Sequence, residues 1–593
     1  MFDGGTVSDF ATRVDAFLSE YFNLLPVAAT SAGMHDHDGR WPDLTEGGRE
    51  VRLAFYDRWT DKLRAFDDAT LTPDERADRD LLLSVLDAHR FAEVDLREDR
   101  WNPLDWVYLL GDGIFSLTSR DFAPLADRLV SVAGRLEGMP AVLSAARKSL
   151  AGNDGGPVAR FHAEKALSQL PGIPELIGEA LETATTAEAS DPAVAAIVPR
   201  LKAAAEVATA ALTGFERHVR DVVLPASAGE GRLGRDLFAR KLLHTFGSDD
   251  VTIDSIGEQA AREFAAVRAE MVRIAREMWP QWLPDKPAPD DDSEAVRSIL
   301  DAIGREHPQR DAILDFCRAE LGRIEAFCRE EDLIGLADEP LEIRWTPVFM
   351  RSFGGAMLNS PGPLDKGQKS FFSVTPIPDD WTAEQAESYL REDNDRMLRL
   401  LTIHEAVPGH YLQGVYANRS PSIARSIFAS GVFAEGWAVY VTQVMLDAGY
   451  GADDPALLLT HWKFYLRAVT NAMIDIAIHT ADMTEDEAVS LMVDGGFQEE
   501  AEARAKYDRA RLSSTQLCTY FIGSMAMWDL ERERRRRLAA ASGDARGARA
   551  VPEPRVVGGF GETPGFVYRD HLESVLAHGT PPIPILRRLV LGD

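Results

Sequence analysis

The sequence predicts a mostly α-helical protein with one small β-sheet or hairpin. Over the first 225 residues, apolar side chains recur at three- and four-residue spacing with charges between them, as in "LADRLVSVAGRLEGMPAVLSAARKSLA" (125–151). Alanine and leucine dominate these segments, which favours close packing of helices. Between about 340 and 378 the pattern changes to β-branched and aromatic residues in alternation, and from 383 onward it is helical again.

Two interruptions organise this helical pattern. The stretch "PASAGEGRLG" (225–234) is small, polar and glycine-rich, and it predicts a linker. We therefore expect an N-terminal helical region over residues 1–232 and a second, catalytic region over 233–593. Within the second region, "LEIRWTPVFM" and "KSFFSVTPI" flank the turn-rich "NSPGPLDKGQ", which predicts a β-hairpin or sheet edge across 341–377.

Composition excludes several classes of protein. Hydrophobic residues make up 45% and charged residues 27% of the 593 residues, as in ordinary soluble domains. The net charge of -31 disfavours nucleic acid and anionic membranes as partners, because both repel an acidic surface. The arginine run "ERERRRRL" (531–538) is therefore interpreted as a solvated or salt-bridged helix face.

The location expected for the protein is the cytoplasm. Its three cysteines, Cys317, Cys328 and Cys518, are too few for a disulfide framework and lack Cys-x-x-Cys spacing, which fits a reducing compartment. The first residues show no basic segment followed by an apolar core, so we expect no secretory signal. No run of about 18 uncharged apolar residues predicts a membrane span.

The stretch "TIHEAVPGHYLQ" (402–413) carries the strongest chemical signal. It places His410 six residues after His404, with Glu405 directly after the first histidine. Zinc hydrolases usually carry His-Glu-x-x-His, with both histidines one helical turn apart. In an unbroken helix His404 and His410 would lie about 240° apart. Because proline cannot continue a regular helix, we predict a break at Pro408 that lets both imidazoles meet one ion.

A second isolated acid completes the expected site. Glu435 is the only charged residue in the apolar segment 426–446 and lies 25 residues after His410. A lone carboxylate in a buried helix is costly unless a cation or hydrogen-bond partner meets it. The sequence therefore predicts a Zn²⁺ ion bound by His404, His410 and Glu435, with water in the fourth position. An alternative is that Glu435 forms a buried ion pair with an arginine such as Arg467.

A zinc ion at this site would imply a hydrolytic mechanism. The metal would lower the pKa of its bound water toward about 7 and polarise a scissile carbonyl. Glu405 is placed to take the proton of that water as general base. Tyr520 and His479 are the candidates for stabilising the oxyanion, although either could equally be an ordinary core residue. The edge of the β-segment could pair with an extended peptide substrate.

The motifs "HEAVPGHYLQ" and "FAEGWAVY" resemble the bacterial family called domain of unknown function 885, which is grouped with zincin-like metallopeptidases of the gluzincin type. The resemblance implies a multi-helical zincin-like fold, with His404, His410 and Glu435 as zinc ligands and Glu405 as general base. The 25-residue gap is also similar to that of thimet oligopeptidase and its relatives, which place tyrosine or histidine near the oxyanion. Similar segments extend over nearly the whole chain, at 135–150, 233–246, 477–488, 514–523 and 571–590.

One departure from the family pattern lies next to Tyr520. This chain has Ser514-Thr515-Gln516 where the family is expected to have Pro-Gly-Gln, and Phe521 where a lysine is common. The departure concerns the oxyanion and substrate-binding residues and leaves the metal ligands unaffected.

We therefore expect a cytoplasmic zinc metallopeptidase that acts on short peptides in a cleft between helical halves. A zinc amidase or esterase for a non-peptide substrate would share the same chemistry. A helical binding protein with a relic metal site is the alternative from a different class. The sequence leaves open the oligomeric state and the choice between exo- and endopeptidase action.

Overall fold

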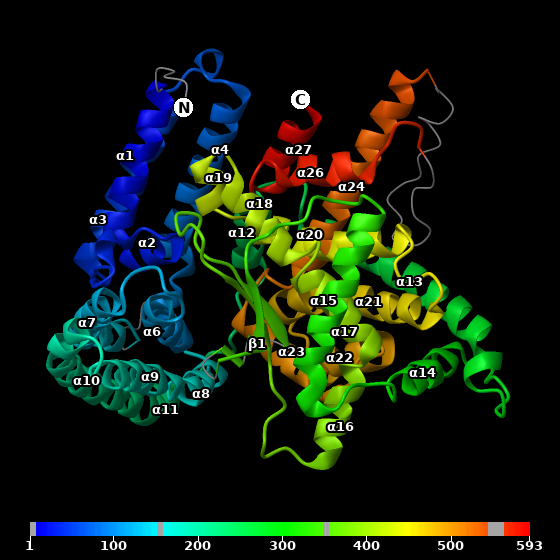
Figure 1. The fold of residues 1–593 in the computed structure, drawn as a ribbon, viewed down its shortest axis with the longest axis horizontal. Coiled ribbons are helices and arrows are strands. Elements are labelled where there is room, and N and C mark those ends of the chain that lie inside the picture. The colour runs from blue at the N-terminus through cyan, green and yellow to red at the C-terminus, as the bar shows by residue number, and fades with distance from the viewer. Residues whose placement is uncertain (1–7, 151–157, 348–349, 352–354, 544–562, 593) are drawn as a thin grey trace. The chain divides into compact units, whose positions relative to one another are not determined.

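The computed structural model describes residues 8–150, 158–347, 350–351, 355–543 and 563–592 (Figure 1). The predicted class is confirmed, because helices account for most of these residues and a three-stranded sheet interrupts them. The chain divides into two compact units. Unit 1 comprises residues 1–232, 347–352 and 361–369, and unit 2 comprises residues 233–346, 353–360 and 370–593.

Unit 1 consists of helices whose two longest members, α7 and α10, pack along each other. Rings of Phe17, Phe55 and Trp59 pack together in its core, at centroid distances of 5.4 to 6.3 Å. Its helices are α1 Asp9–Leu24, α2 Pro26–Ala32, α3 Glu46–Arg64, α4 Pro73–Phe91, α5 Glu98–Trp101, α6 Pro103–Thr118, α7 Leu125–Leu150, α8 Arg160–Gln169, α9 Gly172–Ala187, α10 Pro192–His218 and α11 Leu224–Ala226.

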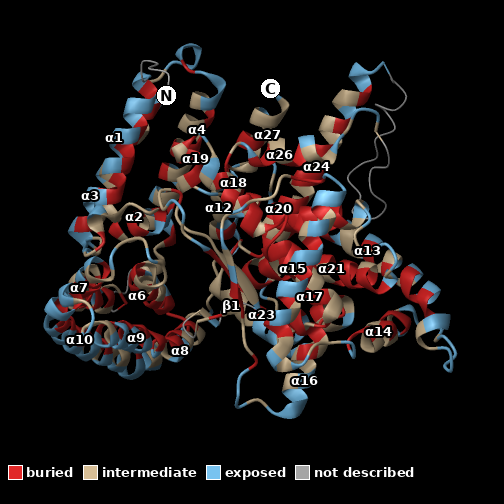
Figure 2. Cartoon of the chain, viewed as in Figure 1, coloured by how far each residue is buried: buried red, intermediate tan, exposed pale blue. Residues whose placement is uncertain are grey.

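Unit 2 contains the sequence motifs, and its most buried helices are α20 and α21 (Figure 2). The predicted linker (225–234) includes the last two residues of α11 and otherwise lies between α11 and α12. The helices of unit 2 are α12 Arg235–Phe246, α13 Ile253–Trp282, α14 Asp292–Ile303, α15 Ile313–Glu330, α16 Ala383–Glu392, α17 Asp395–Glu405, α18 His410–Arg419, α19 Ile423–Ile427, α20 Gly431–Asp447, α21 Pro455–Thr480, α22 Glu485–Ser490, α23 Glu500–Leu512, α24 Cys518–Ala541, α26 Tyr568–Leu576 and α27 Ile583–Leu591.

The small sheet differs from the predicted hairpin in its pairing. Its strands are β1 Leu341–Trp345, β2 Ala356–Asn359 and β3 Ser370–Val374, in the order β1-β3-β2. The two predicted strands, β1 and β3, run parallel and so do not form a hairpin with each other. The unpredicted β2 is antiparallel to β3. The predicted strand segment 341–350 includes residues 348–349, which lie outside the described residues.

The sheet packs against α15 and α17, and this contact positions the site. Phe372 and Val374 of β3 are fully buried and share a core with Leu398 of α17 and Ile313 of α15. All five residues of the central strand, including Ser370 and Ser373, are buried, so both of its faces are covered. As a result, β2 lies beside the C-terminal end of α17.

Helices α20 and α24 approach closely through two glycines. A Cβ atom added at Gly436 would lie 2.3 Å from the backbone carbon of Gly523, and one at Gly523 would lie 2.4 Å from the carbonyl oxygen of Val432. Only glycine allows two helix backbones to come this close. Glu435 precedes the first of these glycines and Tyr520 lies three residues before the second, so the contact fixes both side chains relative to each other.

The described helices contain no apolar stretch long enough to cross a membrane. The arginine run 531–538 lies in α24 and is salt-bridged, as predicted. Arg535 pairs with Glu531 at 2.7 Å, and Arg536 and Arg537 pair with Glu533 at 2.6 and 2.8 Å.

We predict that Gly436→Ala and Gly523→Ala each lower the free energy of unfolding by about 1–3 kcal/mol, because the added methyl group forces two helix backbones apart. Urea denaturation followed by circular dichroism measures the change. Gly322→Ala is the matched control, since nothing lies within 4 Å of its added Cβ in α15. In that exposed helical position alanine should stabilise by up to about 1 kcal/mol. Equal effects at all three glycines would contradict the close-contact explanation.

Candidate metal centre

The predicted helix break is present. Helix α17 ends at Glu405 and α18 begins at His410, with a cis peptide bond between Val407 and Pro408. The amide of Gly409 donates to the carbonyl of Ile403 at 3.1 Å, so the chain folds back on the end of α17. This reversal places His410 beside His404 rather than on the opposite face of one continuous helix.

Glycine is required at position 409 because of this close approach. A Cβ atom there would lie 1.9 Å from the carbonyl oxygen of His404 and 2.4 Å from that of Ile403. The Pro-Gly pair thus has two separate physical roles. Proline ends α17, and glycine allows the turn to lie directly against the helix end.

Trp437 fixes the break from the neighbouring helix. Its indole N–H donates to the carbonyl of Pro408 at 2.8 Å, and the side chain is fully buried. Trp437 lies two residues after Glu435 on α20. The helix that supplies the third predicted ligand therefore also holds the turn that positions the second.

The three predicted ligands converge. The rings of His404 and His410 have their centroids 4.8 Å apart and are nearly perpendicular. An oxygen of Glu435 lies 3.4 Å from Nε2 of His410 and 3.8 Å from Nε2 of His404. Donor atoms that share one zinc ion at bonds of about 2 Å stand roughly 3–4 Å apart. The donor atoms of His404, Glu405 and His410 also lie within 4.8 Å of one another.

The two histidines differ in their electrostatic surroundings. Burial, and then the positive charge of the adjacent His410, lower the pKa of His404 to about 3. Burial also lowers the pKa of His410, but the hydrogen bond with Glu435 and the charge of that carboxylate outweigh burial, so the pKa lies above its usual value. His404 is thus a neutral imidazole, the form that binds a metal ion.

The pKa values of the two carboxylates, Glu405 and Glu435, also shift in opposite directions. Burial raises the pKa of Glu405 to about 7, with His410 opposing this rise and the negative charge of Glu435 supporting it. Burial alone would raise the pKa of Glu435 too, yet His410, His404 and Arg509 together hold it below its ordinary value. Two neighbouring carboxyl groups with divergent pKa values are suited to different roles, one as an anion and one as a proton carrier.

These residues fit a divalent metal of the zinc type. Oε2 of Glu405 is buried and has no hydrogen-bond partner among the described residues. Two imidazole nitrogens and one carboxylate oxygen form the donor set of catalytic zinc sites, which leave one position for water. An oxygen of Glu405 near such a water would gain the partner that it lacks within the described structure.

Tyr520 lies beside this cluster. Its hydroxyl oxygen accepts hydrogen bonds from the Arg509 guanidinium at 2.9 Å and from the Gln516 amide at 3.3 Å. Burial, and then the charge of Glu435, raise the pKa of Tyr520 above its usual value. Because both neighbours donate to the oxygen, the hydroxyl proton is available for another acceptor.

His479, the other oxyanion candidate, is not brought to the cluster. Its Nδ1 accepts from the amide of Leu233 at 3.3 Å, and its Nε2 lies 2.9 Å from the carbonyl of Ala510. On the same helix, Phe464 packs its ring edge-on against His404 with centroids 5.6 Å apart. Fifteen residues separate Phe464 from His479, which corresponds to roughly 22 Å along the helix.

The alternative ion pair between Glu435 and Arg467 does not form among the described residues. Arg467 forms a close ion pair with Glu502 and lies 3.9 Å from Glu392. Glu435 instead faces the two histidines.

Arg509 is a residue of the site that sequence reasoning missed. It lies in "EAEARAKYDRARL", a helix with charged residues in nearly every turn, where one more arginine carries no signal. The only available cue was its spacing of three from Lys506 and seven from Glu502, which places all three on one face.

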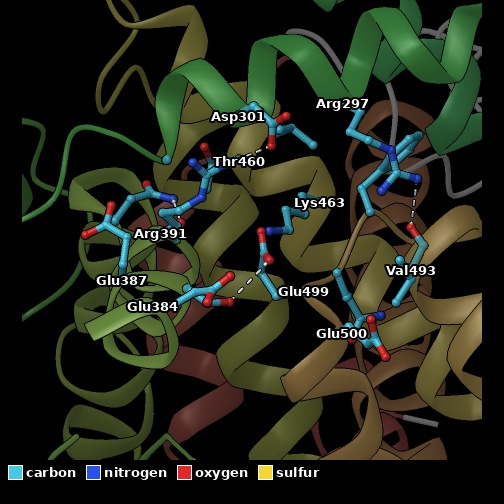
Figure 3. Close-up of a pocket in the computed structure, with 16 residues that line it drawn as sticks. Arg297, Asp301, Glu384, Glu387, Arg391, Thr460, Lys463, Val493, Glu499 and Glu500 are labelled. Atoms are coloured by element: carbon cyan, nitrogen blue, oxygen red, sulfur yellow. Dashed lines mark hydrogen bonds and ion pairs between the residues drawn. The ribbon is translucent and has the colours of Figure 1, made fainter. Parts of the chain in front are cut away.

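A cavity of about 400 Å³ lies elsewhere in unit 2 and shares no lining residue with the metal cluster (Figure 3). Its charged residues are of both signs and are largely paired. Arg391 pairs with Asp301 at 2.9 Å, and Lys463 pairs with Glu392 at 2.7 Å. Arg297 donates to the carbonyl of Val493 at 3.3 Å. We assign no ligand to this cavity.

We predict that Trp437→Phe lowers the free energy of unfolding by about 1–3 kcal/mol beyond the loss of ring volume, because the buried carbonyl of Pro408 loses its donor. The matched control is Trp462→Phe, since the buried indole nitrogen of Trp462 has no partner among the described residues. Urea unfolding of both variants gives the difference. Equal destabilisation would mean that the indole hydrogen bond does not hold the break.

Comparison with known proteins places this architecture in a family. No curated protein sequence matches the chain. A solved structure from Shewanella oneidensis, described as "a putative lipoprotein of unknown function", is 30% identical, with a TM-score of 0.78 over 98% of this chain and 100% of that one. A second, from Colwellia psychrerythraea and also described as a "putative lipoprotein", shares the fold at 14% identity and a TM-score of 0.78, over 99% of each chain. The model of the family described as bacterial protein of unknown function (DUF885) matches residues 26–590, so the chain belongs to that family.

Proposed function

We propose that this protein is a zinc-dependent hydrolase of the zincin-like, gluzincin type that cleaves short peptides. The observation that carries the proposal is the convergence of Nε2 of His404 and Nε2 of His410 on one oxygen of Glu435, at 3.8 and 3.4 Å. Glu405 lies beside them with a buried, unpartnered oxygen.

In this proposal His404, His410 and Glu435 bind the zinc ion. When bound, the ion supplies a water that ionises near neutral pH and polarisation of the scissile carbonyl. Burial and the contact with Glu435 position the imidazoles in advance, so little reorganisation is needed for binding.

Glu405 acts as general base. It takes a proton from the attacking water and passes it to the leaving amine. A pKa of about 7, raised by burial, suits a group that must both accept and release a proton near neutrality. The backbone N–H of Leu358 in β2 interacts with this carboxylate and favours its charged form.

Tyr520 donates to the oxyanion that develops on the carbonyl oxygen. Its oxygen is held by Arg509 and Gln516, so its proton is free to point toward the cluster. Such a preorganised donor stabilises charge that appears only in the transition state. Gln516, which makes this supporting contact, is the residue of Ser514-Thr515-Gln516 that agrees with the expected Pro-Gly-Gln.

The sheet favours a peptide as substrate. The order β1-β3-β2 leaves β2 at an edge, and the amide of Leu358 in this strand interacts with Glu405. An extended peptide could pair with this outer edge and would then lie next to the general base. A zinc amidase or esterase would use the same catalytic residues but would not need the edge.

Location and partners stay predictions. The expectation of a cytoplasmic location comes from the cysteine content and the N-terminal sequence, and it is in tension with the description of the two solved relatives as putative lipoproteins. The net charge of -31 still disfavours nucleic acid as partner. The expected cleft between helical halves is likewise a prediction.

We predict that the purified protein binds about one zinc ion per chain, and that His404→Ala, His410→Ala and Glu435→Ala each weaken zinc binding by at least roughly 100-fold. Metal analysis and competition with a chromogenic chelator measure stoichiometry and affinity. His307→Ala, which removes an imidazole that lies near Glu387, is the matched control and should bind zinc normally. Protein that binds no zinc, or that is indifferent to these substitutions, would overturn the proposal.

For catalysis, Glu405→Gln should retain zinc and lower kcat on a short peptide by about 10²–10⁴-fold, because the water loses its base. Tyr520→Phe should lower kcat by about 10²–10³-fold with little change in KM, because the lost hydrogen bond forms only in the transition state. Tyr416→Phe is the control, since its hydroxyl donates to the carbonyl of Gly335 instead. Full peptidase activity in Glu405→Gln would exclude the assigned mechanism.

A further inference from the structure

We propose that Lys506 and Arg509 of α23, with Arg467 of α21 beside them, form a subsite for the C-terminal carboxylate of the peptide substrate. The inference rests on the proposed peptidase function and sharpens it to exopeptidase action from the C-terminal end.

The subsite follows from one face of α23. Residues 502, 506 and 509 are separated by four and three positions, so their side chains lie along one stripe of the helix. Arg509 occupies the end nearest the metal cluster, where it donates to Tyr520 and interacts with the charge of Glu435. Lys506 follows about one turn away. Helix α21, which carries Arg467 and Phe464, packs against this face.

Lys506 is the clearest sign that an anion is bound. The residue is only 7% exposed, and no hydrogen bond or ion pair within 4.0 Å joins its ammonium group to the described residues, although Glu502 and Glu392 attract it electrostatically. Burial, and then the positive charges of Arg467 and Arg509, lower the pKa of Lys506 well below its usual value. A buried ammonium among like charges is costly unless an anion meets it.

Glu502 and Glu392 attract Lys506, and Glu435 attracts Arg509, but no carboxylate forms an ion pair with either cation among the described residues. Arg467 pairs with Glu502, and Lys463 pairs with Glu392 at 2.7 Å, so these carboxylates already have cationic partners. Arg509 donates only to neutral oxygens, those of Tyr520 and Gln516. Two positive charges next to the catalytic cluster are therefore available to a substrate carboxylate.

The position of the subsite favours a chain end over an acidic side chain. Because Arg509 contacts Tyr520, a carboxylate bound there would lie within one or two residues of the scissile carbonyl, at about 3.3–3.6 Å per extended residue. Beyond Lys506 the same face is occupied by the ion pair of Glu502 with Arg467, and buried Glu392 lies behind that pair. Because this part of the face already holds an ion pair, we take the group bound by Lys506 and Arg509 to be the terminal carboxylate of the peptide.

The test compares three fluorophore-labelled tetrapeptides on metal-free protein by fluorescence anisotropy. One has a free C-terminal carboxylate, the second is its C-terminal amide, and the third is an amide with glutamate as its last residue. We expect the free acid to bind at least roughly tenfold more tightly than either amide. In Lys506→Met this preference should fall to about twofold or less, and in Lys506→Arg it should largely persist.

Folding of the variants is checked by thermal melting. Lys506→Met should melt no lower than the wild type, because it removes an unpaired buried charge. Lys463→Met is the matched control and should melt lower, since it leaves Glu392 without its closest partner. If Lys506→Met does not fold, Lys506→Gln takes its place in the same comparison.

Zinc-loaded protein then separates the two proposals. We expect kcat/KM for the free acid to exceed that for the amides at least roughly tenfold, mainly through KM. Hydrolysis of acid and amide at equal rates would leave the peptidase intact and overturn the subsite. A preference of metal-free protein for the acid, without any hydrolysis on zinc addition, would support the subsite and overturn the peptidase. Tightest binding of the glutamate amide would overturn the assignment to the chain end.

Discussion

The hydrogen bond from the indole of Trp437 to the carbonyl of Pro408 is the contact on which the geometry of the candidate metal centre depends. It joins the break between α17 and α18 to the helix that carries Glu435. Without it, the turn would have a buried, unsatisfied carbonyl, and the position of His410 would depend on its own contact with Glu435 and on the packing of α18 against α20. The glycine contact between α20 and α24 extends the same constraint to Tyr520.

Around these contacts, burial and neighbouring charges give chemically similar groups different pKa values. One buried histidine is kept neutral, the other is held by a carboxylate, and two neighbouring glutamates are driven in opposite directions by burial and by their partners. Such different pKa values in neighbouring groups require a site with little water and few internal hydrogen bonds. Burial also makes the missing ion-pair partner of Lys506 significant, because water would solvate an ammonium group at the surface.

The sequence identified some residues of the site and missed others. What decided this was how far each residue differed in charge from its neighbours along the chain. Glu435 stood out because it is the single charge in an apolar helix, whereas Arg509 and Lys506 were hidden in a helix full of charges. His479 and Tyr520 looked alike as isolated polar residues near the C-terminal helices. Which of the two lies at the cluster depends on where α21 and α24 pass it. Residue spacing along one helix cannot reveal this. The β-segment was recognised from its composition, but parallel pairing of β1 with β3 and the short β2 were not.

By itself, the sequence determined the helical class, the position of the β-segment, the break at Pro408 and the residues His404, Glu405, His410 and Glu435, because periodicity, proline chemistry and isolated buried charge are local properties. Only the tertiary structure decided that Gly409 lies against the end of α17, that β2 rather than a hairpin reaches Glu405, and that the basic face of α23 adjoins Tyr520. These features arise from contacts between segments distant in the chain. Such contacts depend on packing of whole helices, which no local pattern encodes.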